Sequence, residues 1–229
     1  MNNWQAIWNR RSSVDKEYTL EDLIKLDGFD SGAGAISPED WLENCRYISN
    51  ELKLKNGQSV YEVGCGADAF LKGLLESNQL RVGGLDYSEG LIETGKRAFP
   101  DGSFRRAEAD QLDSAQKYDF VISNSVFHYL NPEYASNTLS LMLEKAEKDV
   151  AVLEVPDLAY KEDSERLRQD ALSKEEYRKK YEGLEHTYFL RHWFKDIVNA
   201  ERYECVIKDV MVPNYLQSKF IFNVFILPA

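Results

Sequence analysis

Residues 60–69 read VYEVGCGADA, an apolar run that ends in Gly64-Cys65-Gly66. Such a run predicts a buried strand that turns tightly into a helix. Because glycines have no Cβ, backbone N–H groups at the turn can approach a ligand closely. Asp86 ends a second apolar run, RVGGLD at residues 81–86, twenty residues after Gly66. An acid in that position can accept hydrogen bonds from a ribose diol, so the pattern predicts a nucleotide-like cofactor.

Length and composition indicate a single enzyme-sized domain. The chain has 229 residues, 43% of them hydrophobic, which is enough to bury one core without disulfides or metals. Its three cysteines, Cys45, Cys65 and Cys205, are widely spaced, so no disulfide framework and no metal site are expected. No apolar run is long enough to cross a bilayer and no secretory signal opens the chain, so we expect no membrane partner and a cytoplasmic location.

The net charge is −11. Nucleic-acid affinity depends on Lys and Arg side chains that displace counterions from phosphates, so no nucleic-acid partner is expected. The sequence leaves the oligomeric state open.

Strand and helix patterns alternate along the chain, which predicts an α/β fold with a parallel sheet covered on both faces. The expected strands lie near 58–63, 81–86, 103–107, 118–123, 148–155, 202–212 and 219–227. The expected helices, several with clear capping residues, lie near 20–26, 38–53, 69–77, 89–98 and 132–147. Residues 27–35 form a glycine-rich loop that either lies against a ligand or simply joins two helices.

We divide the single domain into four parts. Residues 1–56 are expected to form a helical N-terminal cap and residues 57–157 the cofactor-binding core. Residues 158–200 are expected to form a helical insertion, whose charged part at 161–185 is either a lid over the active-site mouth or a solvated helix at the sheet edge. Residues 201–229 supply the last strands of the sheet.

The pattern Glu62-x-Gly64-x-Gly66 resembles motif I of the class I S-adenosylmethionine-dependent methyltransferases. A carboxylate before the glycine turn would repel the pyrophosphate of a dinucleotide and attract a sulfonium or ammonium group, which favours this family over dehydrogenases. The resemblance implies S-adenosyl-L-methionine as the cofactor. It also implies a Rossmann-like three-layer sandwich with a seven-stranded, mostly parallel sheet and an antiparallel hairpin at its C-terminal edge.

The resemblance extends over roughly residues 58–155 and implies roles for individual residues. Asp86 would hold the ribose hydroxyls, and Tyr87 would pack against the adenine. Glu108, or Asp110 if the register shifts by two, would receive the adenine amino group. The full set of implied cofactor-binding residues is Glu62, Gly64, Cys65, Gly66, Asp86, Tyr87, Ser88, Glu108, Ala109 and Asn124.

One position departs from the family pattern. Asp68 stands where the family has its third glycine. Aspartate can cap a helix and tolerates left-handed backbone angles, so we expect the turn to survive. Its charge, however, is expected to oppose the carboxylate of the cofactor.

Methyl transfer needs mainly the alignment of nucleophile, methyl group and sulfur, and a base is required only if the acceptor arrives protonated. His128 is the first candidate base because it follows the fourth strand, and His186 and Tyr188 are the others. Each is also compatible with a structural role. Glu154 and Asp157, which follow the fifth strand, either bind the acceptor or cap the next helix.

The sequence predicts a methyltransferase that acts on an oxygen or nitrogen of a small-molecule acceptor. The segment Ser123-Asn124-Ser125 differs from the Asn-Pro-Pro-aromatic signature of enzymes that methylate planar amino groups of adenine or glutamine, so those substrates are set aside. Three alternatives stay open. They are a catalytically silent methyltransferase-like binding subunit, an NAD(P)-dependent oxidoreductase, and a methyltransferase with a protein substrate.

Overall fold

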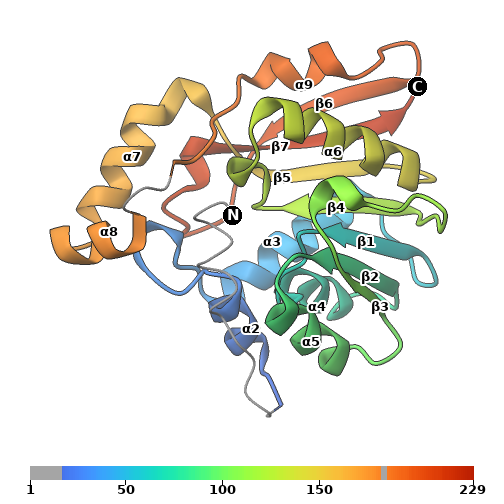
Figure 1. Ribbon diagram of the computed structural model, residues 1–229, viewed down its shortest axis with the longest axis horizontal. Coiled ribbons are helices and arrows are strands. Elements are labelled where there is room, and N and C mark those ends of the chain that lie inside the picture. The colour runs from blue at the N-terminus through green and yellow to red at the C-terminus, as the bar shows by residue number, and fades with distance from the viewer. Residues whose placement is uncertain (1–16, 182–184) are drawn as a thin grey trace.

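The computed structural model describes residues 17–181 and 185–229. Within them, seven strands form one sheet in the order β3-β2-β1-β4-β5-β7-β6 (Figure 1). The strands β1 to β5 pair in parallel, whereas β7 is antiparallel to both β5 and β6. The bounds are β1 Ser59–Val63, β2 Arg81–Asp86, β3 Ser103–Arg106, β4 Phe120–Asn124, β5 Val150–Pro156, β6 Tyr203–Asp209 and β7 Ile221–Pro228. The predicted fold class, including the antiparallel edge hairpin, is confirmed.

Helices cover both faces of the sheet (Figure 1). On one face pack α2 (Leu20–Leu26), α3 (Pro38–Glu51), α4 (Ala69–Leu75) and α5 (Glu89–Ala98), with Trp41, Phe70 and Leu91 against Val60 and Ile122. On the other face lie α6 (Pro132–Lys145) and α9 (Arg191–Ile197). Alternate strand residues therefore enter two separate cores, as expected for a parallel sheet buried on both sides.

The capping residues explain where the predicted helices begin. Thr19 forms a capping box with Asp22 before α2, and Ser37 accepts a hydrogen bond from the Asp40 amide before α3. Asn131 accepts one from the Tyr134 amide before α6. Because these side chains satisfy amides that have no partner inside the helix, all three helices start where the sequence predicts.

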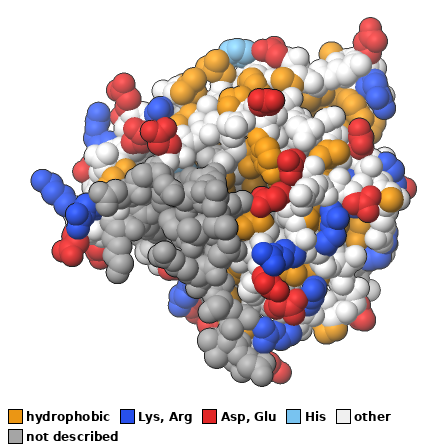
Figure 2. All heavy atoms as spheres, in the orientation of Figure 1, with side chains coloured by type: hydrophobic (Ala, Val, Ile, Leu, Met, Phe, Trp, Pro, Cys, Tyr) orange, Lys and Arg blue, Asp and Glu red, His pale blue; other side chains and the backbone are white. Residues whose placement is uncertain are grey.

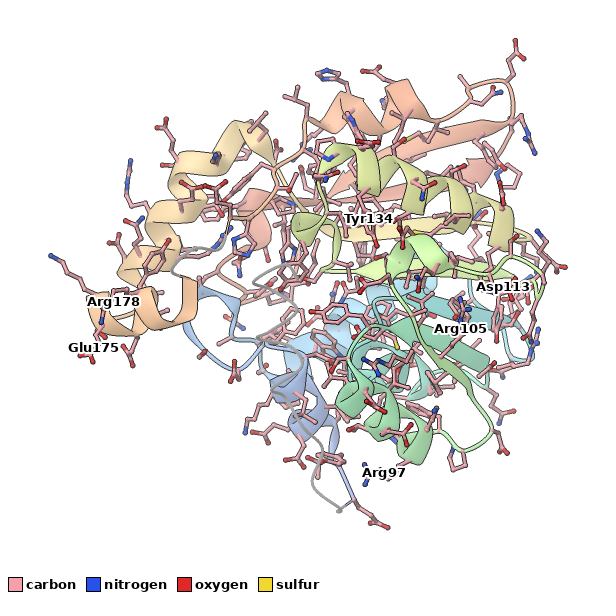
Figure 3. All side chains as sticks on the ribbon, in the orientation of Figure 1. Arg97, Arg105, Asp113, Tyr134, Glu175 and Arg178 are labelled. Carbon is pink, nitrogen blue, oxygen red and sulfur yellow. The ribbon has the colours of Figure 1, made fainter. Side chains whose placement is uncertain are left out.

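The charged stretch after β5 forms α7 (Lys161–Asp170) and α8 (Lys174–Tyr181). Glu175 and Arg178 of α8 point away from the body of the protein (Figure 3). The predicted N-terminal cap and helical insertion also include residues 1–16 and 182–184, which lie outside the described residues. The division of the chain into four parts stays a prediction.

Strand β5 contains a bulge at Glu154. Val150 and Val152 enter the core under α6 and α9, while Ala151 and Leu153 enter the opposite core. Val155 returns to the first core although regular alternation would place it in the second. The ladder explains this, because Val152 pairs with Val224 and Val155 with Phe222, so β5 carries one extra residue. Glu154, at φ 56°, is the residue that leaves the alternation.

The charged surface is mixed. On the face drawn in Figure 2, acidic and basic side chains of the described residues alternate over short distances. In the described ranges, no helix combines the length and apolar character that crossing a membrane requires. Those same ranges contain no group of three His, Cys, Asp or Glu side chains arranged to hold a metal ion.

Candidate active site

A cavity of about 640 Å³ lies at the carboxyl ends of the parallel strands. Residues that end or follow β1, β2, β3, β4 and β5 line it. Further lining residues come from the loop after α2, from α7, and from the segment before β7. Ligands in open α/β sheets bind at this edge, where the loops after neighbouring strands separate. Among the predicted cofactor-binding residues, those that line it are Glu62, Gly64, Cys65, Gly66, Asp86, Tyr87, Glu108, Ala109 and Asn124.

The glycine turn requires both of its glycines. Gly64 has φ +75°, and a Cβ there would lie 2.4 Å from the Val126 side chain. Gly66 has φ +55°, and a Cβ there would lie 2.2 Å from Oδ1 of Asp27. Any larger residue at either position would therefore meet both a steric clash and an unfavourable backbone conformation.

Asp27 approaches the turn from a distant part of the chain. Its carboxylate accepts hydrogen bonds from the amides of Ala67 at 2.5 Å and Ala69 at 3.0 Å, where α4 begins. An acid at a helix N-terminus satisfies amides that lack a partner and interacts favourably with the helix dipole. The loop at 27–35, for which the sequence left two roles open, thus braces the turn and also contributes Asp27, Gly28 and Phe29 to the cavity wall.

Asp86 is held at the edge of the turn. Its carboxylate accepts hydrogen bonds from the amides of Gly66 at 3.2 Å and Ser88 at 2.8 Å. Burial raises the pKa of Asp86 to about 6, against the opposing effect of these two amides. Ser88 is buried and is not among the cavity-lining residues, so in this structure it acts on the site through its amide.

The segment after β3 closes the same end of the cavity. Glu108 and Asp110 both line it, so the two registers considered for the adenine contact remain open. Tyr134 of α6 lies over this segment (Figure 3), and its hydroxyl accepts a hydrogen bond from the Asp110 amide at 3.4 Å. Burial is the main cause that raises the pKa of Tyr134, to about 12.

Three buried acceptors of cavity-lining residues lack partners. Oε2 of Glu62, Oδ1 of Asn124 and Oε1 of Glu154 make no hydrogen bond with any part of the described chain. Burial, followed by the charges of Asp68, Asp27 and Asp86, raises the pKa of Glu62 well above its ordinary value. Buried polar atoms without partners are uncommon and indicate a place where a ligand donor belongs. The residues at this end therefore fit a ligand that carries N–H donors and positive charge.

Asp68 differs from the expectation in two respects. It takes the left-handed conformation that the sequence predicts, at φ 67°, but its side chain makes no cap to α4. The side chain is fully buried and does not line the cavity; instead its carboxyl faces Gly95 of α5, where an added Cβ would lie 1.6 Å from Oδ2. Burial raises the pKa of Asp68 well above its ordinary value. The structure therefore places this carboxyl away from the cavity wall, and its opposition to the cofactor stays a prediction.

The three predicted catalytic residues lie close together, but only two of them line the cavity. His128, in the short helical turn Phe127–Tyr129 after β4, and His186 both line it, with 5.0 Å between ring centroids. Tyr188 does not line it and accepts a hydrogen bond from Nη2 of Arg168 at 2.9 Å. Burial, and then Arg168, lowers the pKa of His128 to about 3.

Further residues belong to the site. Glu154, considered from sequence as an acceptor-binding residue, is buried and lines the cavity, and Tyr215 donates to its Oε2 at 3.2 Å. Burial raises the pKa of Glu154 to about 7, although hydrogen bonds from Tyr215 and Ser125 oppose the shift. Arg168 and Tyr215 were missed. Arg168 is one of many charged residues in its stretch, and no sequence signal separates it from the exposed ones.

Comparison with known proteins identifies the core. Residues 60–149 match the sequence profile of a family described as "Methyltransferase domain". A malonyl-[acyl-carrier protein] O-methyltransferase of Acetivibrio thermocellus is 31% identical over 84 residues, which cover 35% of this chain and 30% of that relative. The matched segment thus spans less than a third of the relative's length.

Solved structures resemble a larger part of the chain. The magnesium protoporphyrin IX methyltransferase of Synechocystis PCC 6803 with bound SAH has a TM-score of 0.62 at 15% identity, over 99% of this chain and 94% of that one. The plantazolicin methyltransferase in complex with a pentazolic desmethylPZN analog and SAH has a TM-score of 0.62 at 15% identity, over 84% and 85% of the two chains. At these identities the likeness establishes the fold. Together with the match of residues 60–149 to a methyltransferase domain, it agrees with the predicted resemblance to the class I, S-adenosylmethionine-dependent methyltransferases.

Proposed function

We propose that this protein transfers a methyl group from S-adenosylmethionine to an oxygen or nitrogen atom of a small-molecule acceptor. The observation that carries the proposal is the attachment of Asp86 to the glycine turn. Two amides orient its carboxylate toward the cavity beside Gly66, where a ribose diol can donate to it. The acceptors of Glu62 and Asn124 that lack hydrogen-bond partners support a ligand with N–H donors at the same place.

When bound, S-adenosylmethionine supplies an electrophilic methyl group on a positively charged sulfur. The protein then has to bind the donor and the acceptor, orient them relative to each other, and exclude water from the site. Glu62, buried and without a partner for Oε2, would regain a favourable interaction from the positive charge of the donor. Tyr87, Glu108, Ala109 and Cys65 would enclose the nucleoside, in keeping with their place on the cavity wall.

A protonated acceptor has to lose its proton, and two residues are suited to take it. Glu154, with a pKa raised to about 7, is matched to proton transfer at neutral pH. His128, with a pKa lowered to about 3, stays neutral but is a weak base. If Glu154 is the base, kcat/KM falls as the pH drops below about 7; if His128 is the base, no such loss occurs until far lower pH. His186 and Tyr188 are better suited to positioning, because both are hydrogen-bonded to Arg168.

The small-molecule class of the acceptor is supported by the cavity and by the relatives. A volume of about 640 Å³ is in the range of small-ligand sites. The similar solved structures are named for magnesium protoporphyrin IX and plantazolicin, which are not macromolecular substrates. The curated relative is named as an O-methyltransferase, which favours oxygen over nitrogen as the methylated atom.

The first experiment is a binding measurement. Calorimetric titration with S-adenosylmethionine, S-adenosylhomocysteine and NADH should give saturable binding of the first two only. The variant Asp86→Asn should weaken both by about tenfold or more, because a charged hydrogen-bond acceptor of the ribose is lost. Asp101→Asn, in an exposed turn, makes the same chemical change outside the site and should bind like the wild type. Binding of NADH alone would favour the oxidoreductase alternative.

A second experiment separates an enzyme from a silent binding subunit. Protein that binds the donor is incubated with methyl-labelled S-adenosylmethionine and fractionated metabolites, and the label is followed by mass spectrometry. Transfer of label into a small molecule is the expected result. Donor binding without transfer to any small molecule or protein fraction would favour the silent subunit, and label in protein would favour a protein substrate.

A further inference from the structure

Arg168 is a buried cation on a helix that is otherwise largely exposed. In α7 the side chains of Ser164 and Arg168, one turn apart, are buried, whereas that of Arg166 is exposed. Arg168 is 7% exposed and lines the cavity. Burial of a guanidinium is unfavourable unless a charged partner and hydrogen bonds compensate for the lost hydration.

The hydrogen bonds of Arg168 go to three neutral groups. Its Nη2 donates to Oγ of Ser164 and to the Tyr188 hydroxyl, each at 2.9 Å, and its Nη1 lies 2.5 Å from Nδ1 of His186. Because a guanidinium can only donate, Nδ1 must accept, which places the proton of a neutral imidazole on Nε2. Burial, followed by His128 and Arg168, lowers the pKa of His186, so this ring is neutral as well.

No acid neutralises Arg168 anywhere in residues 17–181 or 185–229, and its Nε is buried without a hydrogen-bond acceptor. Glu154 lines the same cavity, but its side chain accepts a hydrogen bond from Tyr215 and makes no ion pair with Arg168. Arg168 is the single Lys or Arg among the described residues that line the cavity. The positive charge at this end of the cavity is therefore left uncompensated by the described chain.

The two ends of the cavity differ in charge. Asp27, Glu62, Asp86 and Glu108 gather around the glycine turn, where the proposed function places the positively charged donor. Arg168 reaches the cavity from α7, a separate helix. In a protein with a net charge of −11, a lone buried cation in a cavity is the feature that can retain an anion.

We propose that Arg168 binds a carboxylate group of the methyl acceptor, so that the substrate class is a small carboxylic acid. This inference rests on the proposed function and specifies its acceptor. A carboxylate matches the planar guanidinium and restores the missing counter-charge. A phosphate dianion fits less well, because no second Lys or Arg lines the cavity within the described residues.

The test uses matched acids and amides as probes. The full chain, with and without S-adenosylhomocysteine, is titrated with benzoate, 3-phenylpropionate, their neutral amides and phenyl phosphate at constant ionic strength. At least one carboxylate should bind about tenfold or more tightly than its amide, the usual scale of a charge-assisted hydrogen bond. Arg168→Met should remove this preference. Arg166→Met, the same change two residues away on the exposed face of α7, should keep it.

Arg168→Lys is a second variant that tests the proposal if Arg168→Met does not fold. It retains the positive charge and should fold, but should bind the carboxylate more weakly because an ammonium lacks the planar fork. Equal binding of acid and amide by the wild type, or a preference that persists in a folded Arg168→Met, would overturn the proposal. Tighter binding of phenyl phosphate than of either acid would overturn the carboxylate assignment. Failure of S-adenosylhomocysteine to bind, with the acid preference intact, would instead count against the proposed function.

Discussion

Replacing Glu154 by glutamine should make the free energy of unfolding depend less on pH. Glu154 is 4% exposed, and burial raises its pKa from an ordinary 4.5 to about 7. The folded protein therefore holds this proton more tightly than the unfolded chain does. The stability that results is fully present below pH 4.5 and is lost as the pH rises to about 7. Glu154→Gln has no carboxyl to titrate, so it should not show this loss.

The size of the effect follows from the two pKa values. A difference of about 2.5 pH units corresponds to about 3 kcal/mol of unfolding free energy. Burial causes this upward shift in pKa, hydrogen bonds from Tyr215 and Ser125 oppose it, and no charged neighbour contributes. The titrations of other buried acids should thus cancel when the variant is compared with the wild type. Relative to the wild type, Glu154→Gln should gain about 3 kcal/mol between pH 4.5 and pH 8.

Urea unfolding followed by circular dichroism at several pH values from 4.5 to 8 measures this gain. Glu147→Gln is the matched control, since it makes the same change at an exposed residue and should run parallel to the wild type at every pH. A constant difference between Glu154→Gln and the wild type over the whole range would show that Glu154 has an ordinary pKa in the folded protein. Glu154 would then be ionised well below neutral pH and would no longer be matched to proton transfer at pH 7.

Other substitutions test other parts of the site. Asp27→Ala should lower the unfolding free energy by about 1–2 kcal/mol, because the first amides of α4 lose their acceptor; unchanged urea unfolding would contradict that cap. Asp68→Gly should leave S-adenosylhomocysteine affinity unchanged in calorimetry, because the carboxyl faces Gly95, and tighter binding at low salt would restore the opposition expected from sequence. If Glu154 is the base, His128→Asn should retain the loss of kcat/KM below pH 7, and a profile that becomes flat would assign that limb to His128.

The donor side of the site was predictable because its signals are local. The turn at 64–66 and Asp86 depend on residue types at fixed spacing, and the helix starts depend on capping residues a few positions away. The parallel sheet followed from the alternation of strands and helices. All of these are properties of short segments, which the sequence displays directly.

The rest of the site depends on contacts between distant segments. Asp27 reaches amides 40 and 42 residues further on, and nothing in the loop at 27–35 specifies that contact. Arg168 is buried on α7, which packs against the short helical turns Gly32–Gly34 and Ser218–Phe220 from distant parts of the chain, although its neighbours in sequence are just as charged. The lowered pKa of His128 likewise reflects burial, which a lone histidine in a sequence does not reveal.

The bulge in β5 has a consequence for how Glu154 is specified. Its aim toward the cavity arises from the number of residues between Val152 and Val155, one more than β7 offers between Val224 and Phe222. A substitution at position 154 changes the functional group of the side chain, but the side chain still points toward the cavity. A deletion of one residue there would restore a regular ladder and carry the next side chain into the core. The direction of the side chain at position 154 is therefore set by the number of residues in the strand, and its chemistry by the residue type.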